Sequence, residues 1–370
     1  MTEELSMSEA IVAMHETEGI GWITIDRIVR RGGVQGAQRR READWREYGL
    51  YPRQSSKLVE KLRPEAVDAS RRRRARKGVS VVTPLDPGYP RLLLEIEQPP
   101  WALYYIGRLE LADQPSVAIV GTRMATAYGR RVAEDLAAEC ASGGLTVVSG
   151  LAKGIDAAAH AGALHKPAGT VAVLASPADS PYPYENRALY RDIAREGLVL
   201  SETPLGTPLH PGQFPLRNRI IAGLSLGTVV VEAAERSGAI ITAEHALKMN
   251  RDVFVVPGPI TSPRSAGALR LFREGAKPVM DVSDIKKEYP YLFPRVSEPP
   301  SAGFGQAAAK RLEMSPAERT VYELLLDRPR TVDELAEERA LEDGALHAAL
   351  LALQMKRIVV QRPGALYALL

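Results

Sequence analysis

Three expected turns in the sequence carry glycine or cationic side chains in patterns suited to phosphate. The first runs from Gly121 through Thr122 and Arg123 to Gly129, between an apolar segment and a helix-like segment. A glycine between a strand and a helix leaves backbone N–H groups free for an anion. A guanidinium adds a planar fork that fits phosphate. The spacing is neither the G-x-G-x-x-G of dinucleotide sites nor that of a P-loop.

The second turn also combines glycines with a cation. Its candidate phosphate-binding residues are Ser149, Gly150, Lys153 and Gly154. Asp156 follows at the expected start of a helix, where a carboxylate caps free N–H groups. His160 lies one helical turn after Asp156. We predict that His160 is hydrogen-bonded within the structure and is not catalytic.

A third turn places Arg217 and Arg219 on either side of Asn218, before a further apolar segment. Two arginines flanking an amide suggest a second phosphate clamp. Ser237 and Gly238 then open another helix-like segment. Because turns that follow parallel strands meet at one edge of the sheet, we expect these groups to converge on a single site.

The elements that must position these turns alternate regularly. Apolar, valine-rich segments predict strands at 79–82, 103–106, 117–121, 146–150, 170–174, 198–202, 228–233 and 253–258. Helical patterns fall between them at 129–141, 156–164, 186–196 and 239–249. Strands that are apolar throughout and separated by helices indicate a parallel sheet covered on both faces. The sequence therefore predicts an α/β fold, an extended Rossmann-like, doubly wound and mostly parallel sheet, over residues 79–288.

A small helical module is expected before the sheet, at 1–78. Its Gly19-Ile20-Gly21 turn resembles a helix-hairpin-helix (SAM-like) unit, whose turn contacts DNA phosphate, and equally fits a packing turn between two short helices. The run RRRRARK, Arg71–Lys77, reads as the solvated face of a helix. Proline and alanine at 289–309 predict a linker.

Residues 310–370 have the pattern of a winged helix-turn-helix domain. Helix starts are indicated by Ser315 with Glu318 and by Thr331 with Glu334, two capping-box patterns. The expected recognition helix, Glu342–Arg357, has cations only at its C-terminal end. Readers of the major groove need donors near the N-terminal end of that helix. We therefore predict a protein-interaction or structural role for this domain.

Charge is unevenly distributed along the chain. Residues 1–80 hold 17 Lys and Arg against 12 Asp and Glu, a net of +5, whereas residues 81–300 hold 22 against 23. The predicted sheet domain thus lacks a general positive surface, and nucleic acid would have to bind it at a local site.

Several classes of protein are disfavoured by composition. No apolar run is long enough to span a membrane, and the N-terminal MTEELSMSEA does not read as a secretory signal. Cys140 is the single cysteine. We therefore expect a cytoplasmic protein. No cysteine–histidine cluster for zinc and no G-x-S-x-G elbow occur, and no cofactor is expected.

Six segments, in order, resemble the bacterial DNA processing protein A (DprA/Smf) family. They are GTRMATAYG, SGLAKGIDAAAH, SETPLG, FPLRNRIIAGLS, VVEAAERSGAIITA and VFVVPGPI, within Asp86–Val282. Two positions depart from the family pattern: Tyr184 follows the Tyr-Pro pair where a basic residue is frequent, and Leu269 stands where asparagine is common.

The resemblance implies a protein that binds single-stranded DNA, protects incoming DNA in natural transformation and loads the RecA recombinase. It also implies a homodimer through the Rossmann-like domain, contact with single-strand-binding protein as a further option, and no established enzymatic activity. An alternative class stays open. A related Rossmann-like family hydrolyses nucleoside monophosphates with an arginine and a glutamate, roles that Arg219 and Glu232 would fill.

Overall fold

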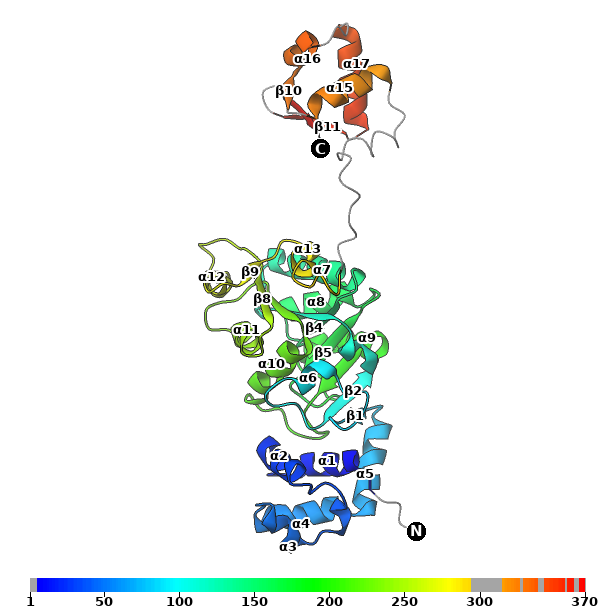
Figure 1. Cartoon of the computed structure of the whole chain (residues 1–370), viewed down its shortest axis with the longest axis vertical. Helices are drawn as coiled ribbons and strands as arrows, with labels where there is room; N and C mark the ends of the chain where they lie inside the picture. The colour runs from blue at the N-terminus through cyan, green and yellow to red at the C-terminus, as the bar shows by residue number, and fades with distance from the viewer. Residues whose placement is uncertain are drawn as a thin grey trace. The chain divides into compact units, whose positions relative to one another are not determined.

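The computed structural model describes residues 5–293, 315–326, 329–338, 343–356, 358–362 and 366–369. The chain divides into two compact units, one ending at Phe293 and the other covering residues 294–370 (Figure 1). Tyr289 is buried and donates a hydrogen bond to Asp252, and Phe293 packs on the same core. The folded part of the first unit thus includes the beginning of the predicted linker. The rest of that segment, 294–309, lies outside the described residues.

A nine-stranded sheet forms the centre of the first unit and confirms the predicted fold class. The strand order is β1-β2-β6-β5-β4-β3-β7-β8-β9. All neighbours from β6 to β9 are parallel, whereas β2 pairs antiparallel with β6 and with β1. The strands are β1 (Ser80–Val82), β2 (Leu103–Gly107), β3 (Ser116–Val120), β4 (Thr146–Ser149), β5 (Thr170–Leu174), β6 (Leu198–Ser201), β7 (Gly227–Val230), β8 (Asp252–Val255) and β9 (Lys277–Pro278).

Helices cover both faces of this sheet (Figure 1). They are α6 (Arg91–Leu94), α7 (Ala127–Ser142), α8 (Ile155–Ala163), α9 (Arg187–Glu196), α10 (Gln213–Leu224), α11 (Gly238–Lys248), α12 (Ala266–Arg273) and α13 (Val282–Lys286). Side chains of β3 alternate between the two layers: Ala118 and Val120 pack with α10 and α11, and Val117 and Ile119 pack with α7 and α8. This alternation is why the strands are apolar throughout.

Two strands are shorter than the apolar runs that predict them. The segments 228–233 and 253–258 leave the strands after Val230 and Val255. The next residues, Val231 and Val256, stay buried, and each donates its N–H to a neighbouring strand. The apolar run is longer than the strand in both cases, because the first residue after the strand is also buried beneath the helices.

From residue 5 onward, five α-helices precede the sheet: α1 (Met7–His15), α2 (Trp22–Arg30), α3 (Glu42–Glu47), α4 (Pro52–Lys61) and α5 (Pro64–Arg76). They enclose their own core around Trp45, which is fully buried. In the glycine turn, the carbonyl of Gly19 accepts a hydrogen bond from Gln54, and the Trp22 indole donates to the carbonyl of Pro99. These contacts favour the interpretation as a packing turn.

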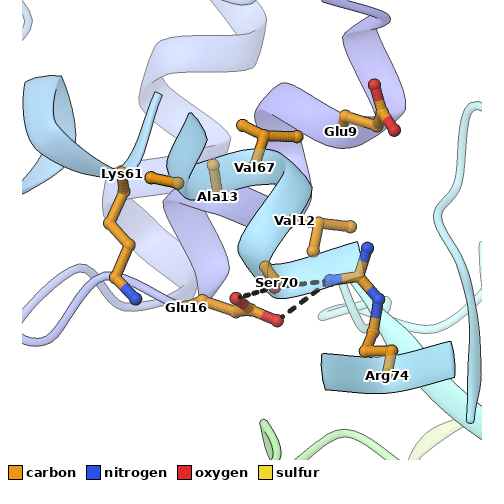
Figure 2. A pocket seen from close by; sticks show the side chains of 9 residues that line it. Glu9, Val12, Ala13, Glu16, Lys61, Val67, Ser70 and Arg74 are labelled. Carbon is orange, nitrogen blue, oxygen red and sulfur yellow. Dashed lines mark hydrogen bonds and ion pairs between the residues drawn. The ribbon is translucent and has the colours of Figure 1, made fainter. Parts of the chain in front are cut away.

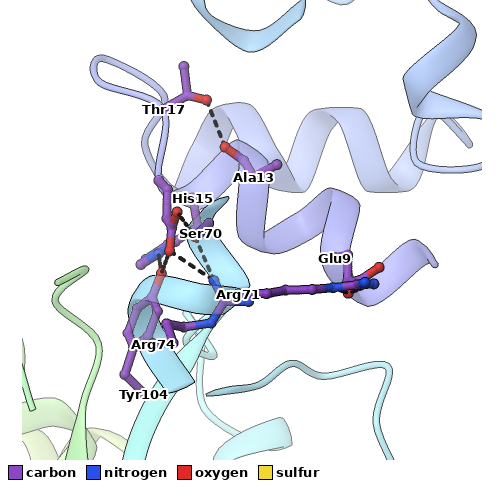
Figure 3. Close-up of polar contacts among 9 residues, drawn as sticks. Glu9, Ala13, His15, Thr17, Ser70, Arg71, Arg74 and Tyr104 are labelled. Atoms are coloured by element: carbon purple, nitrogen blue, oxygen red, sulfur yellow. Dashed lines mark hydrogen bonds and ion pairs between the residues drawn. The ribbon is translucent and has the colours of Figure 1, made fainter. Parts of the chain in front are cut away.

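Helix α5 attaches this module to the sheet through a buried polar cluster (Figures 2 and 3). The carboxylate of Glu16 accepts hydrogen bonds from Ser70 at 2.6 Å and from Arg74 at 3.2 Å. The hydroxyl of Tyr104, on β2, lies 3.4 Å from the same carboxylate. Burial and the nearby Glu16 raise the pKa of the Tyr104 hydroxyl. Arg74 therefore faces the protein interior, unlike most of the RRRRARK run.

The second unit has three helices and a three-stranded sheet among its described residues. In chain order they are α15 (Pro316–Leu325), β10 (Arg330–Thr331), α16 (Val332–Glu338), α17 (Asp343–Met355), β11 (Val359–Arg362) and β12 (Leu366–Leu369). Both capping boxes form: Ser315 with Glu318 and Thr331 with Glu334. The ends of the predicted recognition helix, Glu342 and Arg357, lie outside the described residues.

Over the described ranges, no helix combines the length and the apolar character needed to cross a bilayer.

Candidate phosphate-binding site

Two of the predicted turns, those after β3 and β4, meet at the carboxyl ends of the parallel strands. The prediction of a third turn is wrong: Arg217, Asn218 and Arg219 lie inside helix α10. In the sheet, β4, β5 and β6 lie on one side of β3, and β7, β8 and β9 lie on the other. The chain connections thus change direction at β3, which is where open α/β sheets bind ligands. The turns after β3 and β4 and the N-terminal half of α10 all face this position. Two adjoining cavities open there.

The smaller cavity, about 210 Å³, is lined by Arg123, Gly150, Ala152, Lys153, Tyr182, Pro183, Phe214 and Arg217. The larger, about 350 Å³, includes Gly121, Thr122, Arg123, Met124, Asp156, Phe214, Arg217, Asn218, Ser237, Gly238 and Thr242. Arg123, Phe214 and Arg217 belong to both walls. The structure therefore brings three of the four predicted cations, Arg123, Lys153 and Arg217, to one cavity.

Arg217 lies at the floor of the site. Its side chain is buried, with 7% of the residue exposed. One nitrogen donates to the carbonyl of Val173 at 2.8 Å, and the buried Nε has no hydrogen-bond partner. Within the described part of the chain, no carboxylate lies within ion-pair distance of it. Burial lowers the pKa of the guanidinium to about 10, so Arg217 stays charged at neutral pH.

Gly150 makes room for this arginine. A Cβ atom at position 150 would lie 1.6 Å from the Nη1 atom of Arg217. Any side chain there would push the guanidinium away from the floor of the cavity. Gly150 therefore serves the site by allowing the arginine to lie against the backbone.

The other two cations are exposed at the rim. The guanidinium of Arg123 lies over the ring of Phe214, 5.2 Å from its centroid. Lys153 forms an ion pair with Glu185, and both side chains are more than half exposed, at 52% and 60%. An exposed pair of this kind adds little stability, because water screens its charges. Lys153 can therefore exchange Glu185 for an anionic ligand at small cost.

The backbone N–H groups of the second turn are used inside the protein. Gly150 and Ala152 donate theirs to the carboxylate of Asp156, at 3.1 and 3.4 Å, and Leu151 donates to His160. Burial raises the pKa of the Asp156 carboxyl, against the opposing effect of Arg217. At this turn, an anion would thus meet the side chain of Lys153 and not the amides of Gly150, Leu151 and Ala152.

Three further predicted residues hold the turns in place and do not line either cavity. Ser149 donates its hydroxyl to the carbonyl of Ile119. A Cβ at Gly129 would lie 2.4 Å from the Glu232 carboxyl carbon. Gly154 has φ of +82°, and a Cβ there would lie 2.4 Å from the carbonyl oxygen of Thr122. Gly154 thus lets the second turn pack directly on the first.

Arg219 points away from the cavities. It forms an ion pair with the carboxylate of Glu202, at 2.5 and 2.6 Å to the two oxygens, and donates to the carbonyl of Gln98. Glu232 accepts hydrogen bonds from the N–H and hydroxyl of Thr126, which caps α7. Arg219 and Glu232, the pair that a nucleotide hydrolase would need, therefore have separate partners.

Aromatic walls are the part of the site that sequence reasoning missed. The rings of Tyr182 and Phe214 meet edge to face, with centroids 6.0 Å apart. Phe214 stands three residues before Arg217 on α10, and this i, i+3 spacing places both on one helix face. That spacing could have identified Phe214. Tyr184, one of the two departures, is exposed and lies under the guanidinium of Arg187.

His160 is a buried, neutral group below the site. Its Nδ1 lies 2.7 Å from the Thr170 hydroxyl, and its Nε2 accepts the N–H of Leu151 at 3.3 Å. Because Thr170 donates its own proton to the carbonyl of Val147, Nδ1 is the protonated nitrogen. Burial and the charge of Arg217 lower the pKa of His160 to about 3. The predicted hydrogen-bonded role is what the structure shows.

This depressed pKa makes stability depend on pH. Below about pH 6.5 the unfolded chain gains a proton at His160 that the folded chain does not bind, so acid favours unfolding. Between pH 7 and pH 5, we expect His160 alone to lower the free energy of unfolding by about 2 kcal/mol. Urea unfolding of the wild type and of His160→Gln at both pH values measures this. An equal loss in both proteins would contradict it.

No group of three or more His, Cys, Asp or Glu side chains that could hold a metal ion occurs among the residues the structure describes.

Comparisons with known proteins agree over most of the chain. The model of the family described as DNA recombination-mediator protein A matches residues 80–290, and that of the DprA winged helix domain matches 305–365. The chain is 38% identical over 321 residues to Protein Smf of Synechocystis sp., covering 79% of this chain and 80% of that protein. It is also 38% identical over 224 residues to DNA processing protein DprA of Bacillus subtilis, covering 60% and 75%.

Two solved structures are similar as well. The X-ray structure of DprA from Streptococcus pneumoniae has a TM-score of 0.68 and 34% identity, covering 77% of this chain and 98% of that one. DNA processing protein A from Helicobacter pylori, described for its single-stranded DNA binding mode, has a TM-score of 0.53 and 30% identity, covering 58% and 96%. With the family's sheet and winged-helix domains both matched, this chain belongs to the DNA recombination-mediator protein A (DprA) family.

Proposed function

We propose that this protein binds single-stranded DNA without catalysing a reaction, and that it holds the phosphate backbone in the two cavities at the carboxyl ends of β3 and β4. The observation that carries the proposal is Arg217. A guanidinium that is buried and charged, with Asp156 acting on it only from beyond ion-pair distance, is costly unless a ligand completes its contacts. Phosphate oxygens would do so. The single-stranded DNA binding described for the Helicobacter pylori protein supports this.

The cavity walls favour a single strand over a duplex. Tyr182 and Phe214 offer aromatic surfaces beside the cations, and bases of a single strand stack on such surfaces with little sequence preference. Gly121, Thr122, Asn218, Ser237 and Gly238 complete the proposed binding surface. In a duplex the bases are paired and stacked, so they are not available to these rings. Since neither phosphate contact nor base stacking depends on the identity of the base, we expect binding of single strands with little sequence preference.

A wider role follows from the family. We propose that the protein protects incoming DNA in natural transformation and loads RecA onto it, acting as a homodimer through the sheet domain. For the winged helix we propose protein interaction. Helix α17 exposes Leu351 and Met355, and Lys356 is engaged by Glu318 at 2.9 Å. A helix with this surface is poorly suited to reading a duplex.

The competing proposal, hydrolysis of nucleoside monophosphates, is weakened by the separate partners of Arg219 and Glu232. Measuring the release of base or phosphate from nucleotides distinguishes the two. Sustained release that is lost in an Arg219 variant would favour the enzyme.

Fluorescence anisotropy with labelled oligo-dT over a salt series tests the binding proposal. With three cations on phosphate, log K should fall with log salt with a slope of about −2. Arg123→Glu should lower the affinity at least tenfold at low salt, because it reverses a charge at the rim. Arg195→Glu is the matched control, since Arg195 lies in the last turn of α9, at the opposite, amino end of β6. Salt-independent binding, or equal losses in both variants, would count against the cavity.

A further inference from the structure

Helix α5 carries cations that the site described above does not use. Arg72, Arg73 and Arg76 are all exposed, and within the described residues none of them forms an ion pair. Their neighbours are engaged: Arg71 with Glu9 and Asp68, Arg74 with Glu16. The arginine run thus divides into residues that hold the fold and residues that do not.

The direction of these side chains follows from helix geometry. Arg74 faces the interior, next to Glu16 and Ser70 (Figure 2). At about 100° per residue, Arg72 and Arg76 point to the opposite side of the helix. Arg73 and Lys77 lie between these two directions, on one flank. The four cations Lys77, Arg73, Arg76 and Arg72 therefore form one continuous band around the C-terminal half of α5, here called the α5 basic band.

One flank of the α5 basic band contacts the loops that wall the cavity. Lys77 pairs with Asp179, which precedes the cavity residue Tyr182 in the same loop, at 3.7 Å. Arg73 lies beside Gly206, with its Nη1 3.7 Å from where a Cβ would stand, in the loop that leads to Phe214. The two loops meet at the cavity through Tyr182 and Phe214. They therefore connect the cavity directly to the band.

We propose that single-stranded DNA leaving the cavity continues over these two loops onto the α5 basic band, with Arg72, Arg73 and Arg76 contacting its phosphates. The inference rests on the proposed function, and it adds a second segment to the binding surface. The flexible backbone of a single strand can follow such a path. The binding site is thereby longer than the cavity, and the N-terminal module takes part in it.

Length-dependent binding tests this, with dT oligonucleotides of about 6 and about 25 nucleotides, since a single binding module covers about 4–16 nucleotides. The test protein is the full chain with Arg72→Gln, Arg73→Gln and Arg76→Gln, which removes charge from exposed helix positions. We expect at least a tenfold loss of affinity for the long oligonucleotide at low salt. For the long oligonucleotide, the slope of log K against log salt should change from about −4 in the wild type to about −2 in the variant, because three of six phosphate contacts are lost. Affinity for the short oligonucleotide should stay within twofold.

Two controls make the result decisive. Arg30→Gln, Arg46→Gln and Arg53→Gln remove the same charge from α2, α3 and α4 of the same module, so an equal loss there would show a general charge effect and overturn the proposal. The proposal would also be overturned if the α5 variant bound the long oligonucleotide as tightly as wild type. The α5 basic band would then be a candidate surface for a protein partner. Arg76→Gln alone should give about a third of the slope change. If wild type fails to bind even the short oligonucleotide, the cavity proposal fails instead.

Discussion

Replacing Arg217 by alanine should lower the affinity for oligo-dT about 30- to 100-fold at low salt. Hydrogen bonds to charged groups contribute about 1.5–3 kcal/mol, and about 1.4 kcal/mol corresponds to a factor of ten. The fold should survive, because Arg217 has only one protein hydrogen bond, to Val173, and no ion pair within the described residues. Removing a buried charge favours the folded state, whereas Asp156 loses the nearby positive charge that favours its ionised form. Because these effects oppose each other, we expect the free energy of unfolding to change by about 1 kcal/mol.

Two companion variants sharpen this result. Arg217→Lys keeps a positive charge and loses the planar fork, so its affinity should lie between those of wild type and Arg217→Ala. Arg195→Ala removes an exposed arginine at the far end of the sheet and should bind like wild type. If Arg217→Ala binds oligo-dT as tightly as wild type, the cavity is not where phosphate is held.

Arg219→Ala should lower the stability of the fold and leave the affinity for oligo-dT nearly unchanged, the reverse of what we expect for Arg217→Ala. Removing this arginine leaves Glu202 without its partner and the carbonyl of Gln98 without its donor. Breaking a fully buried pair costs about 3–5 kcal/mol. Because the side chain of Glu202 is 24% exposed, we expect about 2–3 kcal/mol here. The affinity of the folded protein for oligo-dT should change less than threefold, since Arg219 lines neither cavity.

Urea unfolding and anisotropy on the same samples measure both effects. Adding Glu202→Gln to Arg219→Ala should recover part of the lost stability, because it removes the unpaired carboxylate. If Arg219→Ala keeps its stability and loses DNA affinity, Arg219 is a DNA-binding residue and the structural role given to it here is wrong.

The contrast between these two arginines follows from helix geometry. They stand two residues apart on α10, so their side chains point about 200° apart around the helix. One direction leads to the strand-end cavity, and the other to Glu202 and the connector at Gln98. One helix thus supplies a proposed binding residue and a structural residue from a single short motif.

Much of this arrangement can be predicted from the sequence, because it depends on local patterns. Apolar strands alternating with amphipathic helices determine the parallel, doubly wound sheet, and capping boxes determine where α15 and α16 begin. Parallel strands necessarily bring their carboxyl-end turns to one edge. This places Arg123 and Lys153 together, as expected, and helix α10 brings Arg217 to the same cavity.

What each side chain does at that edge depends on partners distant in the chain, which only the tertiary structure decides. Arg217 donates to the carbonyl of Val173, 44 residues away, and Arg219 pairs with Glu202, 17 residues away. The direction of Arg74 follows from its contact with Glu16, 58 residues away. Local sequence patterns predict the secondary-structure element in which a side chain lies and the end of the sheet that it reaches. They do not predict its partner. How strongly a side chain interacts with its partner depends on its burial and on the distance between the two groups. Both are defined only in the folded chain.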